Sequence, residues 1–209
     1  MARELVILGG GGHALVVAEA ALAAGNSLAG FLDDDPFAPL WTGSPKAPRL
    51  GGMDALDLLR DPARGWIIGV GDLDLRRALI ARLEGLPGAA SVIHPRASVS
   101  PSASIGGGTF IGPGAVVHTR ARIGEHAIIN SGAIVEHECV IGANAHVAPG
   151  AALAGRASVG PDTLVGLGAR VLPGVAIGAR CIIGAGAVVV EDVPDERIAA
   201  GVPASTRGR

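Results

Sequence analysis

The fold is decided by residues 123–153, which read IGEHAIINSGAIVEHECVIGANAHVAPGAAL. Within this stretch Ile, Val or Leu recurs every six residues, beginning at Ile123, and a small side chain follows four residues after each of them. Because the small residue precedes the next large one by two positions, the alternation of a β-strand turns both side chains to the same side. The stretch therefore predicts short strands that share one interior.

The same register extends over most of the second half of the chain. The large residue recurs at every sixth position from Ile93 to Val189, and all of these residues except Leu153 are β-branched. Turn-forming pairs between them end each strand after a few residues, and the helical period of 3.6 does not fit the spacing. We therefore predict stacked coils of short parallel strands. Cys139 and Cys181 stand in the small position, so both thiols are expected to be buried.

Composition excludes several classes of protein. A chain of 209 residues with 49% apolar residues and a net charge of −2 is not disordered, and its 33 glycines lack the G-X-Y period of collagen. The chain has too few aromatic residues for a base-stacking platform, with three Phe, two Trp and no Tyr. Its Lys and Arg residues are scattered along the sequence, which argues against a surface that binds a phosphate backbone. We expect no nucleic-acid partner. The sequence has no apolar run long enough for a membrane span and no signal-peptide pattern, so we expect no membrane association and a cytoplasmic location.

The first ninety residues follow a different pattern, in which short apolar runs alternate with helical segments. An apolar run from Glu4 to Leu8 is followed by Gly9-Gly10-Gly11-Gly12-His13 and by a helix-like segment that stops at Gly25. Two further apolar runs are expected as strands, and a last amphipathic segment as a helix; these are Leu28–Leu32, Trp66–Val70 and Leu73–Leu83. This order predicts an α/β domain with a small Rossmann-like parallel sheet.

We divide the chain accordingly into residues 1–90, the small α/β domain; 91–194, the repeat domain; and 195–209, a C-terminal tail. In the first part, the glycine loop and the acidic cluster Asp33-Asp34-Asp35 follow the first two strands, at the sheet edge where open α/β sheets bind ligands. A glycine loop that opens a helix suits a nucleoside diphosphate. Two alternatives remain open: a dinucleotide site, for which the domain lacks the second half, and glycines needed only for a tight turn.

The repeat domain resembles the hexapeptide-repeat proteins, whose [LIV]-G-x-x-[AST]-x unit is visible as IGGGTF, IGPGAV, IGANAH and VGPDTL. The resemblance covers residues 93 to 193, about half of the chain. It implies an all-β left-handed parallel β-helix of triangular cross-section with three repeats to each coil. It also implies assembly as a homotrimer and an acyltransferase activity that uses acetyl-CoA bound between neighbouring subunits.

A second resemblance, to a narrower family, covers nearly the whole chain. The Gly-Gly-His loop, the Leu-Asp-Asp after the second strand, the stretch from Gly69 to Arg77 and the Glu-His-Glu-Cys segment together resemble bacterial nucleotide-sugar N-acetyltransferases related to sialic acid O-acetyltransferases. The resemblance implies that residues 1–90 are a nucleotide-sugar-binding domain. It also implies that the residues binding the nucleotide-linked amino sugar are Gly11, Gly12, His13, Asp33 and Asp34. The chain departs from its relatives at Gly10-Gly11, where these often have Ala and Ser.

His137 stands out among the histidines because Glu136 and Glu138 flank it. Transfer of an acetyl group to an amine needs a base, and imidazole suits that task at neutral pH, while a carboxylate on the other ring nitrogen fixes its tautomer. The resemblance assigns the base to His137 and the carboxylate to Glu138; on sequence alone Glu136 competes for the second role. None of the five histidines in the second half is at an inward position, so we expect each to reach solvent or a neighbouring subunit.

The resemblance also implies an acetyl-CoA site on the repeat domain. His146 and the backbone of Gly155 would contact the thioester end, Gly155 as an oxyanion donor. The residues expected to flank the pantetheine and adenine are Leu167, Gly168, Gly184 and Ala185. Asn130 either positions the acceptor or caps a turn.

The function predicted from these observations is acetyl-CoA-dependent N-acetylation of a nucleotide-linked amino deoxysugar by direct attack, with no metal. One alternative is O-acetylation of a sugar hydroxyl, as in the sialic-acid type. Another is a zinc-dependent hydratase of the carbonic anhydrase type, whose ligands would be drawn from His118, His126 and His137. A sugar-nucleotide sensor without catalysis would need the first domain alone.

Overall fold

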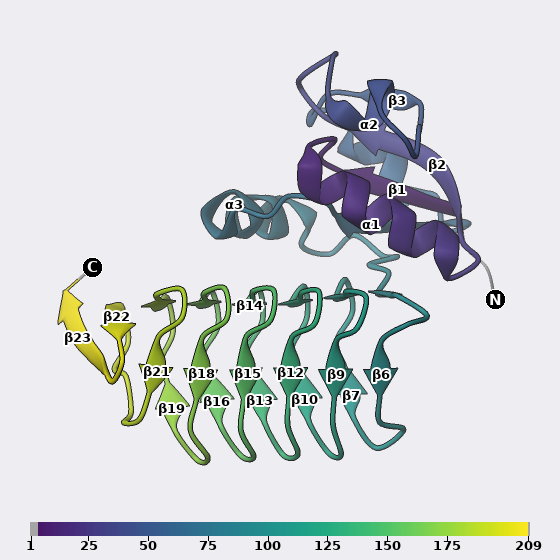
Figure 1. Cartoon of the computed structure of the whole chain (residues 1–209). Helices are drawn as coiled ribbons and strands as arrows, with labels where there is room; N and C mark the ends of the chain where they lie inside the picture. The colour runs from purple at the N-terminus through teal and green to yellow at the C-terminus, as the bar shows by residue number, and fades with distance from the viewer. Residues whose placement is uncertain (1–3, 209) are drawn as a thin grey trace. The chain divides into compact units, whose positions relative to one another are not determined.

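The computed structural model describes residues 4–208. The chain forms two compact units that divide between Pro95 and Arg96, and each is described by itself (Figure 1). Among the described residues, no helix has both the length and the apolar character needed to cross a membrane.

The first unit is an α/β domain built on a four-stranded parallel sheet in the order β3-β2-β1-β4. Leu8 at the end of β1 pairs with Leu32 on one side and Ile68 on the other, so the carboxyl ends of three strands meet at one edge. The strands are β1 (Glu4–Leu8), β2 (Ser27–Leu32), β3 (Arg49–Gly51) and β4 (Arg64–Ile68), with a short β5 (Val92–Ile93) near the end of the unit; the helices are α1 (Gly12–Ala23), α2 (Pro39–Thr42), η1 (Leu56–Arg60) and α3 (Leu73–Leu83).

The parallel α/β architecture expected for this region is confirmed, with shifts at several element boundaries. The helix α1 begins at Gly12, inside the glycine loop, with Gly11 as its N-cap. The strand expected at Trp66–Val70 is β4, which starts at Arg64 and ends at Ile68. The sequence analysis missed β3, because three residues of mixed polarity carry no periodic signal. Core side chains from the strands and α3 include Val6, Leu8, Leu32, Trp66, Ile68, Leu79 and Leu83.

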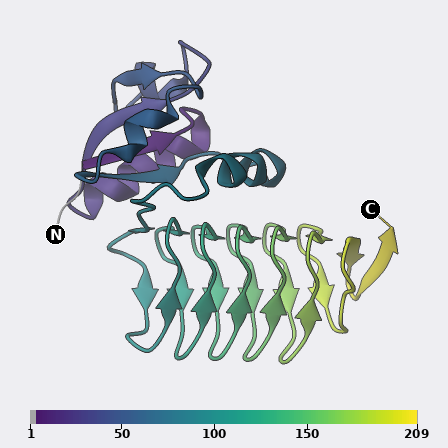
Figure 2. The same ribbon diagram turned by 180° about the vertical axis from the view of Figure 1, so that it is seen from behind.

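The second unit is a left-handed parallel β-helix in which two-residue strands repeat every six residues (Figures 1 and 2). Three parallel sheets form its faces, in the orders β6-β9-β12-β15-β18-β21, β7-β10-β13-β16-β19, and β8-β11-β14-β17-β20 continued by β22 and β23. The strands are β6 (Ser98–Val99), β7 (Ser104–Ile105), β8 (Phe110–Ile111), β9 (Val116–Val117), β10 (Arg122–Ile123), β11 (Ile128–Ile129), β12 (Ile134–Val135), β13 (Val140–Ile141), β14 (His146–Val147), β15 (Ala152–Leu153), β16 (Ser158–Val159), β17 (Leu164–Val165), β18 (Arg170–Val171), β19 (Ala176–Ile177), β20 (Ile182–Ile183) and β21 (Val188–Val189).

The register shows how the six-residue pattern fills the interior. Val117 pairs with Val135 and Val135 with Leu153, so every third large residue of the repeat stacks on the one before it, in the neighbouring coil. The large residues from Ile111 to Val189 are all buried, as the repeat predicts. Each coil therefore takes three repeats, one for each face, and the branched aliphatic side chains replace the aromatic bulk that the sequence lacks.

The corners of the prism carry left-handed backbone at every sixth residue. Glycine fills half of these positions, since it adopts positive φ without a steric cost, and the corner that contains Gly132 and Gly150 uses glycine throughout its central coils. Arg120 and Glu138, at another corner, adopt φ values of 57° and 61° despite their side chains. Such a backbone is uncommon outside glycine, Asn and Asp, so the side chains at this corner are of interest.

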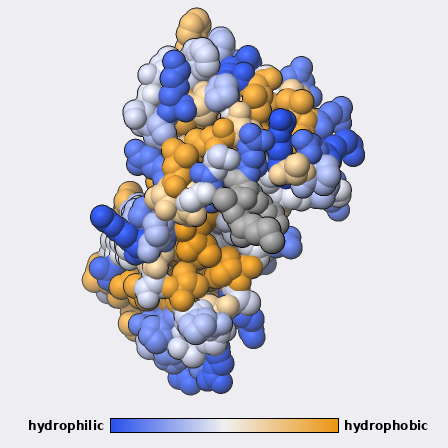
Figure 3. Space-filling model, turned by 90° about the vertical axis from the view of Figure 1, so that its right-hand side faces the viewer, coloured by the Kyte–Doolittle hydropathy of each residue, from blue (hydrophilic) through white to orange (hydrophobic). Residues whose placement is uncertain are grey.

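The two ends of the prism differ. At the end where the repeat begins, Val99 and Ile105 are only half-buried because no earlier coil covers them, and Figure 3, which views this end, shows hydrophobic residues gathered there. At the other end the segment expected as a tail is structured. Its strand β22 (Arg197–Gly201) pairs with β20, and β23 (Ala204–Gly208) returns antiparallel to β22.

Candidate active site

His137 and Glu138 lie at the corner that follows β12. The Nδ1 atom of His137 is 3.4 Å from Oε2 of Glu138, and the other oxygen of that carboxylate is 3.0 Å from Nη2 of Arg120. The imidazole is half exposed and the carboxylate somewhat less, so both can meet a ligand from outside the chain. A carboxylate beside Nδ1 favours the tautomer in which Nδ1 carries the hydrogen and Nε2 is the acceptor.

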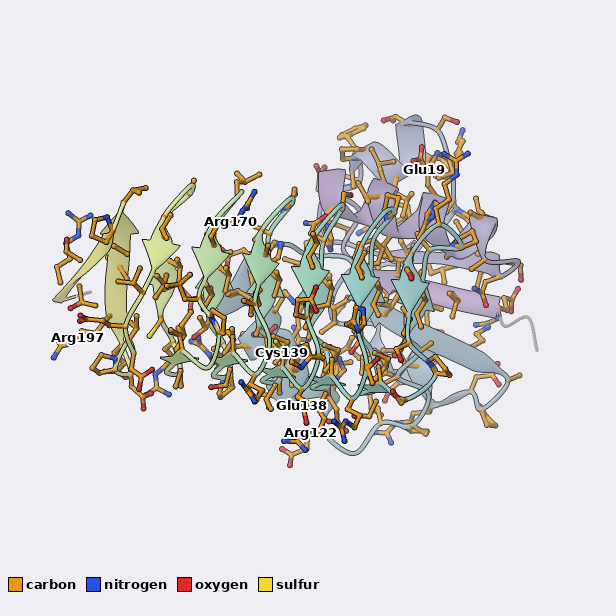
Figure 4. All side chains as sticks on the ribbon, turned by 60° about the horizontal axis from the view of Figure 1, so that its bottom comes forward. Glu19, Arg122, Glu138, Cys139, Arg170 and Arg197 are labelled. Atoms are coloured by element: carbon orange, nitrogen blue, oxygen red, sulfur yellow. The ribbon has the colours of Figure 1, made fainter. Side chains whose placement is uncertain are left out.

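The stacking of successive coils explains this arrangement. Arg120 and Glu138 occupy the same corner position in neighbouring coils, and both backbones turn in the left-handed region. In Figure 4 Glu138 lies toward the outer edge of the coils, and Cys139, the next residue, lies further inside. The sequence analysis did not identify Arg120. Its position three repeats before Glu138 predicts that the two residues occupy the same corner of neighbouring coils. Glu136, the competing carboxylate, uses Oε2 to accept the backbone N–H of His137 at 3.3 Å.

Gly155 lies one coil further, directly against the ring of His137. A Cβ atom at Gly155 would overlap Nε2 of His137 and lie 2.6 Å from Cε1. At other corners of the prism the same position of the six-residue repeat holds a side chain, for example Ala143 and Leu167, so the turn itself does not require glycine there. The absence of a side chain at Gly155 therefore makes room for the imidazole.

The N–H of Gly155 is an open donor at this corner. At equivalent positions the N–H groups of Thr119 and His137 are capped by the preceding side chains, at 2.9 and 3.3 Å. Ala154 precedes Gly155, and its methyl group cannot accept a hydrogen bond. Within residues 4–208 the N–H of Gly155 has no acceptor. An imidazole and an unsatisfied backbone donor thus lie side by side, an arrangement suited to acyl transfer.

Asn130 and His146 lie together, but at another part of the prism. The side-chain nitrogen Nδ2 of Asn130 is 3.1 Å from Nε2 of His146, because β11 and β14 pair in the same sheet. Asn130 also accepts the N–H of Ser131 through Oδ1 at 2.8 Å, which is the turn-capping role. Within one chain, His146 and Gly155 follow different faces, so the structure does not bring these two predicted contacts together.

The remaining residues predicted to contact acetyl-CoA lie at the same corner of the prism as Asn130, two and three coils further along. Leu167 and Ala185 occupy equivalent positions in neighbouring coils, where the N–H of Gly186 donates to the carbonyl of Leu167 at 2.8 Å. Leu167 is 58% exposed, an unusual state for a large apolar side chain. Gly168 and Gly184 lie in the same turns. This corner therefore presents exposed apolar and glycine surface in the coils that follow Asn130.

In the first unit, the acidic cluster organises the glycine loop. The Oδ2 atom of Asp33 accepts the N–H of Gly10 at 2.6 Å, and Oδ1 accepts the N–H of Asp35 at 2.8 Å. Gly10 has no room for a side chain, since a Cβ would lie 2.6 Å from Cε2 of Phe31, whereas Gly11 and Gly12 face open space. The glycine required for packing is thus Gly10, and the two glycines predicted to meet the substrate are free to do so.

A pocket of about 320 Å³ adjoins this loop, at the carboxyl edge of the sheet. One rim is acidic, formed by Asp33 and Asp34, and Oδ1 of Asp34 accepts the N–H of Met53 at 2.8 Å. The other lining residues are mostly apolar: Met53, Val70, Leu75, Ala78 and Leu79, with Arg82. His13, in the first turn of α1, lies near Gly71 after β4. An apolar slot with convergent polar groups is typical of a small-molecule site.

Arg76 binds backbone carbonyls at the same edge of the sheet. The sequence analysis did not single it out. Its side chain is buried, and Nη1 donates to the carbonyls of Ile68 and Val70 at 3.1 and 2.9 Å. Burial lowers the pKa of Arg76 to about 10, so the group stays charged at neutral pH. Arg76 lies within the stretch from Gly69 to Arg77 that carried part of the family resemblance.

Two expectations about titratable side chains have different outcomes. Cys139 and Cys181 are buried and unbridged, as predicted. His126 was expected to reach solvent or a neighbouring subunit, and the first alternative is wrong: only 9% of the residue is exposed, because its ring packs against Gly108 of the preceding coil. Among residues 4–208, the His, Cys, Asp and Glu side chains form no group of three that is placed to bind a metal ion.

Comparison with protein families gives matches in both units. Residues 4–83 match the PglD N-terminal domain, and residues 120–155 and 156–190 match the bacterial transferase hexapeptide of six repeats. Comparison with curated proteins gives no match.

Several solved structures resemble the whole chain. PerB from Caulobacter crescentus, in complex with CoA and GDP-perosamine, is 42% identical with a TM-score of 0.90, over 98% of this chain and 97% of that one. The acetyltransferase domain of PglB from Neisseria gonorrhoeae FA1090 is 34% identical with a TM-score of 0.91, over 98% and 100% of the two chains. WeeI from Acinetobacter baumannii AYE is 26% identical with a TM-score of 0.80, over 98% and 100%.

These matches extend over both units of the chain. The chain is an acyltransferase, and it belongs to the nucleotide-sugar N-acetyltransferases of the hexapeptide-repeat family.

Proposed function

We propose that this chain transfers the acetyl group of acetyl-CoA to the amino group of a nucleotide-linked amino deoxysugar, with His137 as general base. The observation that carries the proposal is the position of the His137 ring between the carboxylate of Glu138 and the open N–H of Gly155. The PerB relative was also solved with CoA and GDP-perosamine after replacement of one histidine by asparagine or alanine, which supports a central role for a histidine in this family.

In the proposed mechanism, Glu138 accepts a hydrogen bond from Nδ1–H of His137 and so leaves Nε2 unprotonated. The amino nitrogen of the sugar attacks the thioester carbonyl and forms the new C–N bond while Nε2 takes a proton from that nitrogen. The N–H of Gly155 donates to the oxygen that becomes negative. When the C–S bond breaks, the protonated imidazole returns its proton to the thiolate of CoA.

Attack is direct, without an acyl-enzyme intermediate. A covalent route would need an accessible nucleophile near His137. The nearest cysteine, Cys139, is fully buried, and burial raises the pKa of its thiol. The base therefore acts on the incoming amine.

For the acceptor, we propose that Gly11, Gly12 and His13 bind the diphosphate and the sugar, and that Asp34 and the adjoining pocket take up the nucleoside. The open space at Gly11 and Gly12, at the start of α1, supports this assignment, because the N–H groups of a helix N-terminus favour anions. Asp33 would act by holding the loop at Gly10. GDP-perosamine, the ligand of PerB, is the first acceptor to test.

For acetyl-CoA, we propose that the corner that contains Asn130 lies along the pantetheine, with contacts from His146, Leu167, Gly168, Gly184 and Ala185. Its exposed apolar and side-chain-free surface supports this assignment. In one chain, His137 and Gly155 lie at one corner of the prism and His146 lies at another. They would form one site if His137 and Gly155 came from one subunit and His146 from its neighbour.

Such a site calls for an oligomer, and we propose a homotrimer. Large apolar side chains are exposed along the sheet that contains β12, where Ile134, Leu172 and Val190 are 37%, 42% and 38% exposed. Burial of these side chains against another copy would contribute to assembly. His137 directly follows this face, so the assembly would place a second chain beside it. Light scattering coupled to gel filtration tests the trimer, and a monomer at working concentration would contradict it.

We also propose a cytoplasmic location. Both cysteines are unbridged, which is usual in a reducing compartment. Fractionation of the source cells tests this proposal, and recovery of the protein in an oxidising compartment would contradict it.

The main experiment offers acetyl-CoA with a panel of sugar nucleotides that bear amino or hydroxyl groups, and follows the release of free thiol. We expect turnover with an amino sugar only, and a kcat about 10²- to 10⁴-fold lower for His137→Gln with little change in acetyl-CoA binding. Turnover only with hydroxyl acceptors would favour O-acetylation. Full activity of His137→Gln would rule out His137 as the base.

A further inference from the structure

The thiol of Cys139 has a specific partner in the next coil. Its Sγ atom donates to the carbonyl oxygen of Ala154 at 3.2 Å. Cys139 is fully buried on the inward side of the coil, and it follows directly after the His137-Glu138 pair. The same carbonyl accepts the N–H of Ala157 at 3.1 Å, so both of its lone pairs are engaged from within the protein.

That carbonyl belongs to the peptide group whose N–H is the open donor of Gly155. The peptide bond between Ala154 and Gly155 is trans, and in a trans peptide the C=O and N–H bonds point in opposite directions. Because the carbonyl faces the thiol in the interior, the N–H of Gly155 is directed outward. The imidazole of His137 lies on that outer side, in contact with Gly155.

The thiol is suited to this role because it keeps its proton. Burial raises the pKa of Cys139, which keeps the group a neutral donor at neutral pH. A hydrogen bond to the carbonyl of an amide polarises the whole peptide group, and hydrogen bonds in such chains strengthen one another by about 10–30% each. The N–H at the other end of the peptide then becomes a better donor.

Similar contacts elsewhere in the prism show what is particular to Cys139. Thr109 and Thr163, at the same inward position of the repeat, donate to the carbonyls of Gly124 and Gly178 at 3.0 and 2.7 Å. Cys181 donates to the carbonyl of Pro194 at 3.1 Å. Such bonds are thus a recurrent element of the interior, and the bond of Cys139 differs because the peptide it contacts faces the candidate catalytic ring.

We propose that Cys139 is a positioning residue that fixes and polarises the Ala154–Gly155 peptide, so that the N–H of Gly155 stabilises the oxyanion formed during acetyl transfer. The proposal rests on the proposed function, in which His137 is the base and Gly155 the oxyanion donor. Cys139 itself touches no substrate.

The test compares Cys139→Val with Cys139→Thr, because the two side chains have nearly the same shape and only Thr has a donor. An oxyanion donor is worth about 10²- to 10³-fold in kcat, and a strengthening of 10–30% of that free energy corresponds to about 2- to 8-fold. We expect the kcat of the Val variant to be lower than that of the Thr variant by this factor. The KM values for acetyl-CoA and for the best sugar nucleotide of the screen should be equal in the two variants.

The matched control is the same pair at the other thiol, Cys181→Val and Cys181→Thr. Cys181 donates to a carbonyl of the interior in a coil remote in sequence from His137, so the two variants should have equal kcat. Any loss of stability from the missing hydrogen bond should be similar at both sites, and thermal unfolding measures it. A merely structural role for Cys139 predicts that kcat follows stability at both sites alike.

Equal kcat for Cys139→Val and Cys139→Thr would overturn the proposal, as would a difference of the same size between the two Cys181 variants. His137→Gln is assayed in parallel. If that variant is impaired and the Cys139 pair is equal, only the role of Cys139 fails. If His137→Gln retains full activity, the proposed function fails as well.

Discussion

Replacement of Gly155 by alanine tests the geometry of the site with a single methyl group. The new Cβ would lie 2.6 Å from Cε1 of His137, and ordinary contacts of this kind begin at 3.4 Å. Because Nε2 lies still closer to the new Cβ, the ring must move by at least roughly 0.8 Å, the difference between these two distances. The backbone itself is not strained, because φ at Gly155 is not positive and the same position of the six-residue repeat holds Ala143 at another corner.

The expected effect on catalysis follows from this displacement. A misplacement of a catalytic group by about 1 Å costs on the order of 10²-fold in rate, so we expect kcat to fall by about 10²-fold in Gly155→Ala. The imidazole is half exposed and can swing outward, so the loss of stability should be small. The KM for the sugar nucleotide should stay within about twofold, because the glycine loop and acidic cluster are in the other unit.

The assay is thiol release under saturating acetyl-CoA, with thermal unfolding measured on the same samples. The control is Ala143→Gly, which changes one methyl group at the same position of the six-residue repeat, at another corner, and should leave kcat unchanged. A Gly155→Ala enzyme with the kcat of the unmodified protein would contradict this account of the site. It would show that the imidazole in contact with Gly155 is not in its reactive position.

Three further substitutions test other parts of the structure. Glu138→Gln should lower kcat by no more than about fivefold, because exposed ion pairs are worth about 0.2–1 kcal/mol; a loss above 10²-fold would contradict this. Asp33→Asn removes a charge-assisted hydrogen bond to Gly10, worth about 1.5–3 kcal/mol, and should raise the sugar-nucleotide KM about tenfold or more without changing that for acetyl-CoA. Leu153→Ala, in the fully buried interior, should lower the free energy of unfolding by about 2–5 kcal/mol in denaturant titrations, and a change below about 1 kcal/mol would contradict the packing.

The sequence predicted which residues carry the chemistry better than it predicted which residues lie close together in the folded chain. His137 and Glu138 are adjacent in the chain, so a local motif was sufficient to suggest the pair. Arg120 reaches the same carboxylate only because successive coils stack in register. The open donor at Gly155 depends on two further facts that no motif records: Ala154 offers no cap, and the carbonyl of Ala154 is turned inward.

In the first unit the limits are of the same kind. The apolar runs predicted the strands, and the glycines predicted a loop that opens a helix. The need for Gly10 in particular comes from Phe31 and Ala38, which pack over it from a distant part of the chain. Nothing in the sequence indicated that His126 is buried, because its burial follows from packing against Gly108 of the preceding coil.

The amino-acid sequence predicted stacked coils of short parallel strands for the repeat domain, because the six-residue period of branched aliphatic and small side chains is repeated in each coil. The left-handed, triangular form was implied by the resemblance to the hexapeptide-repeat proteins. The sequence also specified the parallel α/β class of the first unit, from runs whose length and order are local properties. Which groups meet one another became known only from the folded chain. The partners of Glu138, Gly155, Asp33 and Cys139 lie in a neighbouring coil or on a neighbouring strand, and their approach depends on register and on the direction of individual peptide groups, which hydrophobic periodicity does not encode.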